Sequence, residues 1–231
     1  MNYLEKVLHE PDEIKEIIRL FFMEPVPKEE IDKYTKIELE EVAITFLNLL
    51  LNIKIDKIIE LIEKNYMYIK EIDSKNIPQF SNINNIDKVL NIISSNENIL
   101  YKDIGYYFNK NASEIAQQKY GENHYKICSQ IGFTTEKKPY SLTFIGEEYK
   151  KFSKDEKEDL KTKLMLRIPI IQYIIVNAKK GRVSVMELLE QYVAKSTAVR
   201  RRSNIKVIVN KIVDLAGNEY KEIINNNIDW K

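Results

Sequence analysis

The chain has 231 residues, of which 44% are hydrophobic and 31% are charged, and its formal net charge is +1. These values are ordinary for a soluble globular protein of one large domain or two to three small ones. The longest apolar run, residues 42–53, is interrupted by polar residues and is too short to span a bilayer, so no membrane partner is expected. Residues 1–10 lack the pattern of a secretory signal, and we expect a cytoplasmic protein.

The small net charge hides an uneven distribution along the chain. Residues 1–90 carry 12 Lys and Arg against 18 Asp and Glu, whereas residues 91–231 carry 24 against 17. The basic excess is largest over residues 137–211, with 18 against 8. We therefore expect the C-terminal part to meet a polyanion and the acidic N-terminal part to act as a scaffold or a protein contact.

The N-terminal third shows apolar residues at helical spacing. The predicted elements are helices over residues 12–23, 37–51 and 56–64, a strand over residues 66–72 and a linker over residues 73–85. Pro25 and Pro27 end the first helix because proline cannot continue it. We assign residues 1–80 to an N-terminal helical domain, whose pattern is also compatible with a winged helix.

Residues 84–152 follow the order of a winged-helix domain. The predicted elements are helices over residues 86–93, 100–108 and 112–131, and strands over residues 133–136 and 140–144. Gly121 is a candidate break or kink in the third helix, and Gly132 suits its C-cap. Lys137 and Lys138 would form the hairpin tip, where they are well placed for phosphate contact.

The same order recurs over residues 155–231, which we predict to be a second winged-helix domain. The predicted elements are helices over residues 155–178, 185–193 and 196–215 and a small wing over residues 217–230. Pro169 is expected to kink or divide the first of these helices, and Ser184 to cap the second. The expected fold class is mainly α with small β-hairpins, in tandem winged helix-turn-helix domains behind the N-terminal helical domain.

The segment of residues 195–211 is the most informative part of the chain. It contains six basic residues and no acidic one: Lys195, Arg200, Arg201, Arg202, Lys206 and Lys211. Ser196 or Thr197 can cap a helix there. One helical face is apolar, with Ile205, Ile208, Ile212 and Leu215, and the opposite stripe holds Arg200, Ser203, Asn204, Val207 and Lys211. A buried face backed by a basic, hydrogen-bonding face is what a helix that reads a DNA groove needs.

Two fragments resemble known families. Ile131-Gly132-Phe133, followed by Leu142-Thr143-Phe144-Ile145-Gly146, resembles the wing region and Leu-Thr-x-x-Gly segment of many prokaryotic winged helices. Ser196-Thr197-x-x-Arg200-Arg201, followed by Ile205, resembles a segment of winged-helix domains associated with restriction-modification and phage-defence proteins. Such domains are DNA-recognition parts of modular restriction enzymes or lie beside defence ATPases.

The resemblance implies that Arg200, Arg202, Asn204 and Lys206 face DNA, where arginine can contact guanine and asparagine adenine. Arg201 falls near the apolar face, so phosphate contact and an ion pair with Glu187 or Glu190 remain alternatives. In the first unit a polar helix face offers Gln117, Gln118, Lys119, Asn123, His124 and Lys126, for which a solvated face is the alternative. The candidate DNA-contacting residues are Lys119, Asn123, His124, Lys126, Lys137, Lys138, Lys195, Ser196, Thr197, Arg200, Arg201, Arg202, Asn204, Lys206 and Lys211.

No catalytic constellation stands out in the sequence. Neither G-x-x-x-x-G-K-[ST] nor G-x-G-x-x-G occurs, and the histidines are His9 and His124 alone. The acidic-x-Lys pattern of metal-dependent nucleases occurs within one predicted helical turn, at residues 11–15, instead of on two strands. Cys128 lies among apolar helix residues and is expected to be a core residue. We expect no enzymatic activity, no cofactor and no metal.

The sequence therefore predicts double-stranded DNA binding by tandem winged helices, as a recognition part of a restriction or defence system. The alternatives are a protein-interaction adaptor that docks a nuclease or ATPase, a transcriptional regulator, and a divergent nuclease. The basic residues distinguish the first two, because on a DNA-binding protein they form one continuous surface and are not neutralised by acidic neighbours.

Overall fold

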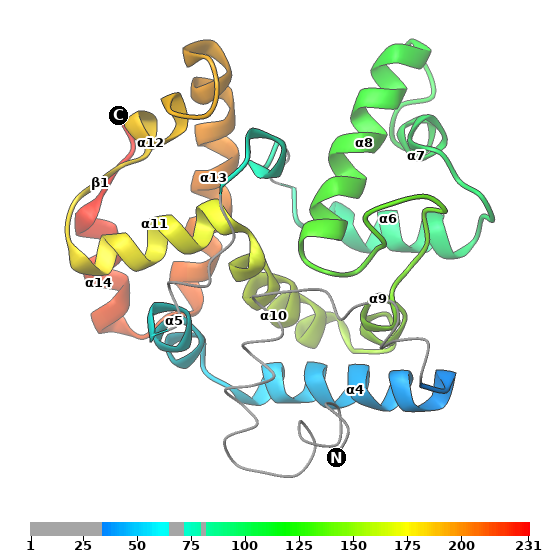
Figure 1. Cartoon of the computed structure of the whole chain (residues 1–231), viewed down its shortest axis with the longest axis horizontal. Helices are drawn as coiled ribbons and strands as arrows, with labels where there is room; N and C mark the ends of the chain where they lie inside the picture. Colours follow the sequence, from blue (N-terminus) through cyan, green and yellow to red (C-terminus); the bar gives the residue numbers. More distant parts are fainter. Residues whose placement is uncertain (1–33, 65–71, 80–81) are drawn as a thin grey trace.

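The structure is a computed structural model that describes residues 34–64, 72–79 and 82–231 (Figure 1). The predicted helix over residues 12–23 and nearly all of the predicted strand over residues 66–72 lie outside the described residues. As predicted, the described part of the chain is mainly helical, and its sheet consists of two strands of two residues each.

The elements follow one another with short connections. In chain order they are α4 (Lys36–Asn52), α5 (Ile55–Lys64), the 3-10 turn η2 (Ser74–Asn76), α6 (Asn85–Ser94), α7 (Tyr101–Phe108), α8 (Glu114–Gln130), α9 (Phe144–Tyr149), α10 (Lys154–Leu164), the 3-10 turn η3 (Met165–Arg167), α11 (Pro169–Lys180), β1 (Val183–Ser184), α12 (Val185–Glu190), α13 (Lys195–Leu215), α14 (Asn218–Asn227) and β2 (Ile228–Asp229). Buried hydrophobic side chains from α4 to β2 form one contiguous core. The division into three domains stays a prediction.

Helix α4 is closed at both ends by side chains. At its start the Thr35 hydroxyl accepts from the Glu38 N–H (3.3 Å) and the Glu38 carboxylate accepts from the Thr35 N–H (2.7 Å), which is a capping box. At its end the buried Lys163 of α10 donates from Nζ to the carbonyls of Leu50 and Leu51, at 2.7 and 3.1 Å. This lysine satisfies carbonyls that have no partner within the helix, and it ties α4 to α10.

Helices α7 and α8 cross at two glycines. A Cβ on Gly105 would lie 1.9 Å from the Gln117 carbonyl oxygen, and a Cβ on Gly121 would lie 1.7 Å from the Tyr101 carbonyl oxygen. Helix α8 runs unbroken through Gly121, so a break at this residue, one of the two predicted possibilities, is wrong. Glycine lies there because two backbones can approach this closely only where no side chain separates them.

The residues that carry the first resemblance meet in space after α8. Gly132 has a φ of +89°, as its C-cap role requires, and its carbonyl accepts a hydrogen bond from the Thr143 hydroxyl (2.6 Å). The Thr143 hydroxyl accepts in turn from the Gly146 N–H (3.1 Å), which caps α9. A Cβ on Gly146 would lie 2.1 Å from the Phe133 carbonyl oxygen. The glycines and the threonine therefore clamp the two ends of the intervening loop together.

The two strands predicted around this loop are shorter than expected. Thr134 and Leu142 form an isolated antiparallel bridge, and α9 begins at Phe144, inside the predicted second strand. The hairpin loop, residues 135–141, therefore projects from one bridge instead of from a ladder.

The next predicted helix is divided at the predicted place. Helix α10 ends at Leu164, η3 follows, and Pro169 opens α11 at its first position, where the missing N–H costs nothing. The Ser184 hydroxyl caps α12 by accepting from the Glu187 N–H (3.3 Å), as predicted, although α12 ends at Glu190.

The small wing predicted over residues 217–230 is wrong. Asn218–Asn227 form helix α14, which buries Ile224 against the core. The following strand β2 pairs in parallel with β1, with Val183 opposite Ile228. No glycine follows Gly217, so the segment after it lacks the Asn-Gly or Asp-Gly pair that is typical of tight hairpins. The tandem winged-helix arrangement stays a prediction.

The glycine crossing can be tested by substitution. Gly121→Ala must push α7 and α8 apart, and we expect a loss of about 1–3 kcal/mol in the free energy of unfolding, measured by urea denaturation. Gly181→Ala is the matched control, because a Cβ there meets no atom within 4 Å and its φ of 164° is extended backbone. Equal stabilities of the two variants would contradict the close crossing.

Candidate nucleic-acid interface

The basic segment identified in the sequence forms α13, whose apolar face lies in the core. Ile205, Ile208 and Ile212 are fully buried, as predicted. Leu215 is 44% exposed, so its predicted place on the buried face is wrong. The N-cap is Ala194, without a side-chain hydrogen bond, so neither Ser196 nor Thr197 caps the helix. Both residues lie in its first turn, where Ser196 is exposed and Thr197 half-buried.

Four cations of α13 lie outside the core and have no acidic partner among the described residues. Lys195, Arg200 and Lys206 are exposed and Arg202 is half-buried. Among the described residues no carboxylate lies within ion-pair distance of any of these four side chains. Lys206 lies over the Trp230 ring, with its Nζ 5.7 Å from the ring centroid. Asn204 lies half-buried beside them.

Arg201 has a structural position instead. Its side chain is 8% exposed, and its Nη1 donates to the Ser74 carbonyl of η2. Burial, followed by the charge of neighbouring Arg200, lowers the pKa of this guanidinium. Arg201 therefore pairs with neither Glu187 nor Glu190 and is not exposed to a phosphate, so both alternatives considered for it are wrong.

The η2 turn lies between α13 and α8 (Figure 1). While Arg201 holds it from one side, Gln130 of α8 donates from Nε2 to the Asn76 carbonyl (2.9 Å) on the other. Ile77, which follows the turn, is buried. The described part of the predicted linker is therefore a packed spacer between the two helices.

Helix α8 holds four of the predicted DNA-contacting residues in different settings. Lys119 is exposed and Asn123 is half-buried. Lys126 is paired with Glu122 at 2.6 Å, which reduces the charge it offers. The fourth candidate on α8 is His124, which is buried.

His124 is completely buried, so its predicted DNA contact is wrong. Its ring lies 4.2 Å from that of Phe108, between centroids. Nδ1 is 2.7 Å from the Tyr120 carbonyl oxygen, to which it donates, and Nε2 accepts from the Asn85 amide at 3.3 Å. Burial lowers the pKa of the imidazole to about 4, so the ring is neutral at pH 7. The sequence placed it on a polar face because its neighbours in α8 are hydrophilic.

Lys137 and Lys138 lie exposed in the hairpin loop, as predicted. Tyrosines fix this loop to the helices. The Tyr125 hydroxyl of α8 donates to the Thr135 carbonyl (2.8 Å), and the Tyr140 ring stacks on that of Tyr101 with centroids 4.5 Å apart. The two lysines therefore extend from a loop with a fixed base.

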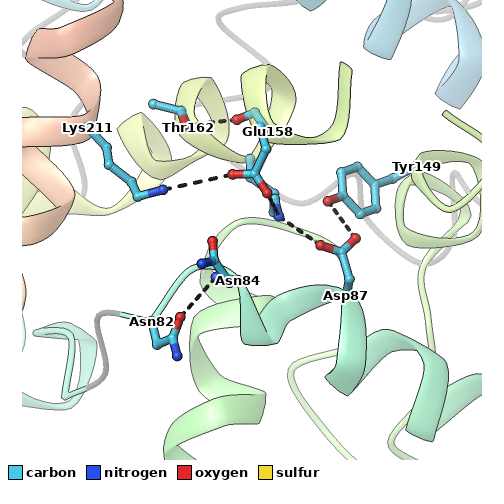
Figure 2. A network of polar contacts seen from close by, with 8 residues as sticks. Asn82, Asn84, Asp87, Tyr149, Glu158, Thr162 and Lys211 are labelled. Carbon is cyan, nitrogen blue, oxygen red and sulfur yellow. Dashed lines mark hydrogen bonds and ion pairs between the residues drawn. The ribbon is translucent and has the colours of Figure 1, made fainter. Parts of the chain in front are cut away.

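A polar network joins α13 to α6 and α9 (Figure 2). Asp87 of α6 accepts from the Tyr149 hydroxyl (3.0 Å) and from Lys161 Nζ (2.7 Å). Lys161, completely buried on α10, also donates to Glu158 (2.5 Å), and Glu158 lies 3.8 Å from Lys211 Nζ. Lys211 is thereby engaged on the protein, unlike Lys195, Arg200, Arg202 and Lys206.

Comparisons with known proteins add no information about this surface. No protein-family model, curated protein or solved structure matches the chain. Within the described residues, His, Cys, Asp and Glu side chains form no cluster of three or more that could hold a metal ion. No described helix has the length and apolar character that crossing a membrane requires.

The network of Figure 2 predicts a specific pattern of stabilities. Lys161→Met removes the buried cation that Asp87 and Glu158 share and leaves Glu158 with Lys211, 3.8 Å away. We expect a loss of roughly 2–4 kcal/mol in the free energy of unfolding. Lys161→Met/Asp87→Asn removes one of those carboxylates as well and should recover most of the loss. Chemical denaturation measures both. A double variant no more stable than the single one would contradict the network.

Proposed function

We propose that the protein binds double-stranded DNA through the exposed face of α13, as a recognition part of a restriction or defence system. One observation carries the proposal: Lys195, Arg200, Arg202 and Lys206 have no acidic partner among the described residues. Lysines elsewhere are often neutralised, as Lys126 is by Glu122 and Lys151 by Glu148. Cations left unpaired within three turns of one helix suit a partner with closely spaced phosphates.

The arrangement around α13 supports a duplex as the partner. Helices α8 and α13 both begin at the upper end of the molecule in Figure 1, with η2 between their bodies. Helices α6, α7 and α8, followed by the Thr134–Leu142 bridge, keep the element order of a winged helix. In the tandem winged-helix arrangement that we propose, α13 enters a groove while Lys119 of α8 and the hairpin lysines meet phosphates.

The assignment to restriction or defence rests on the resemblance of the Ser196–Ile205 segment alone. Within that segment Arg200 is exposed and can contact DNA. Arg201 and Ile205 are buried, and they hold α13 against the rest of the protein. The same chemistry serves a transcriptional regulator, so the class of DNA element bound would separate these two roles.

Binding of labelled duplex DNA at several salt concentrations tests the proposal. The four α13 cations, Lys119 and the two hairpin lysines would neutralise seven phosphates. A plot of log K against log salt should then have a slope of about −6, because each contact releases about one counterion. Arg200→Ala/Arg202→Ala should bind more weakly and bring that slope down by about two.

The matched control removes two lysines elsewhere. Lys54 precedes α5, Lys64 is the last residue of α5, and both are exposed. Lys54→Ala/Lys64→Ala changes the net charge by the same amount. The control should keep the affinity and slope of the wild-type protein. Absence of binding by the wild-type protein, or equal losses in both variants, would overturn the proposal.

A specific observation also favours the adaptor role. Tyr106 and Tyr107 of α7 and Ile115 of α8 are exposed apolar or aromatic side chains near one end of these helices. Such groups gather where a protein contacts another protein. The two roles are compatible, since this surface and the α13 cations belong to different elements.

A further inference from the structure

The exposed face of α13 has an apolar centre. Val199 and Val207 are 46% and 41% exposed, and Ser203 lies between them at four-residue spacing from each. Valine is a poor choice for an exposed helix position, because its branched Cβ loses rotamer freedom and its methyl groups stay in water. Neither valine adds to the core that holds α13 in place.

Unpaired cations lie on both sides of this centre. With about 100° between successive residues, Lys195, Arg202 and Lys206 fall along one edge of the exposed face. Arg200 falls along the other edge, beside Asn204. A helix in the major groove has a phosphate strand on each side and base edges in the middle, which is the same order across its width.

The apolar centre therefore has a defined counterpart in DNA. Of the groups that base pairs present in the major groove, the C5 methyl of thymine is the apolar one. Ser203 adds a polar group between the valines, and its hydroxyl donates back to the Val199 carbonyl at 3.5 Å. Its oxygen is thereby left as an acceptor towards a base amino group.

We propose that Val199 and Val207 contact thymine methyl groups, so that the duplexes this protein prefers carry thymine at fixed positions. The inference rests on the proposed function and names its substrate class. Contacts to phosphates from the two edges supply affinity for any duplex, and the valines supply the preference among duplexes.

Replacing thymine by deoxyuridine tests this directly, because uracil lacks the C5 methyl and keeps the same hydrogen-bonding groups. Duplexes are first selected from a random pool by the wild-type protein and then synthesised with thymine or with uracil at each position. We expect one or two positions where uracil weakens binding about fourfold, which is about 0.8 kcal/mol for one buried methyl group.

Protein variants locate the contact. Val199→Ala/Val207→Ala should bind thymine and uracil duplexes equally, at the affinity of the wild-type protein for uracil. Leu215→Ala is the matched control, because Leu215 is exposed on the same helix outside this face, and it should keep the full preference.

The outcomes separate the two proposals. Selected duplexes that bind equally well with uracil at every position, or a preference for thymine that survives in Val199→Ala/Val207→Ala, would overturn the inference and leave the proposed DNA binding intact. Absence of any duplex binding by the wild-type protein would overturn both.

Discussion

The arrangement of the protein depends on two lysines buried in α10. Lys161 and Lys163 are two residues apart, so their side chains leave α10 in different directions. Lys161 reaches Asp87 of α6 and Lys163 reaches the last carbonyls of α4. A buried ammonium group is tolerated only where hydrogen bonds and an opposite charge compensate it, so each lysine fixes the position of a neighbouring helix. Through Glu158 the same constraint extends to Lys211 on α13.

This constraint divides the basic residues into two groups. Lys161, Lys163, Lys179 and Arg201 are engaged with protein groups, and they hold elements together. Lys195, Arg200, Arg202 and Lys206 keep their charge available at the surface. The basic excess over residues 137–211 contains both groups, so the number of charges in a segment overstates the surface charge. The four α13 cations that have no acidic partner among the described residues are what supports the proposed DNA binding.

Much of the helical order follows from the sequence, because apolar periodicity, Ser184, Gly132 and Pro169 act locally. Four errors arose where distant contacts decide. Glycine has a low helix propensity, which suggested a break at Gly121, but this residue is needed because the Tyr101 backbone of α7 lies too close for a side chain. His124 lies among polar neighbours, but α7 covers it, and Arg201 meets the Ser74 carbonyl more than a hundred residues away in the chain. Residues 218–227 form a helix because Ile224 can be buried against the core.

The most direct test of the account is the reactivity of individual lysines with and without duplex DNA. Acetylation of the free protein and of its DNA complex, read by mass spectrometry, reports which amines the duplex covers. The account predicts protection of Lys195 and Lys206 on α13, with Lys54 and Lys64 beside α5 unchanged. Equal reactivity of Lys195 and Lys206 in both states, at a DNA concentration that saturates binding, would contradict the assignment of DNA to this face.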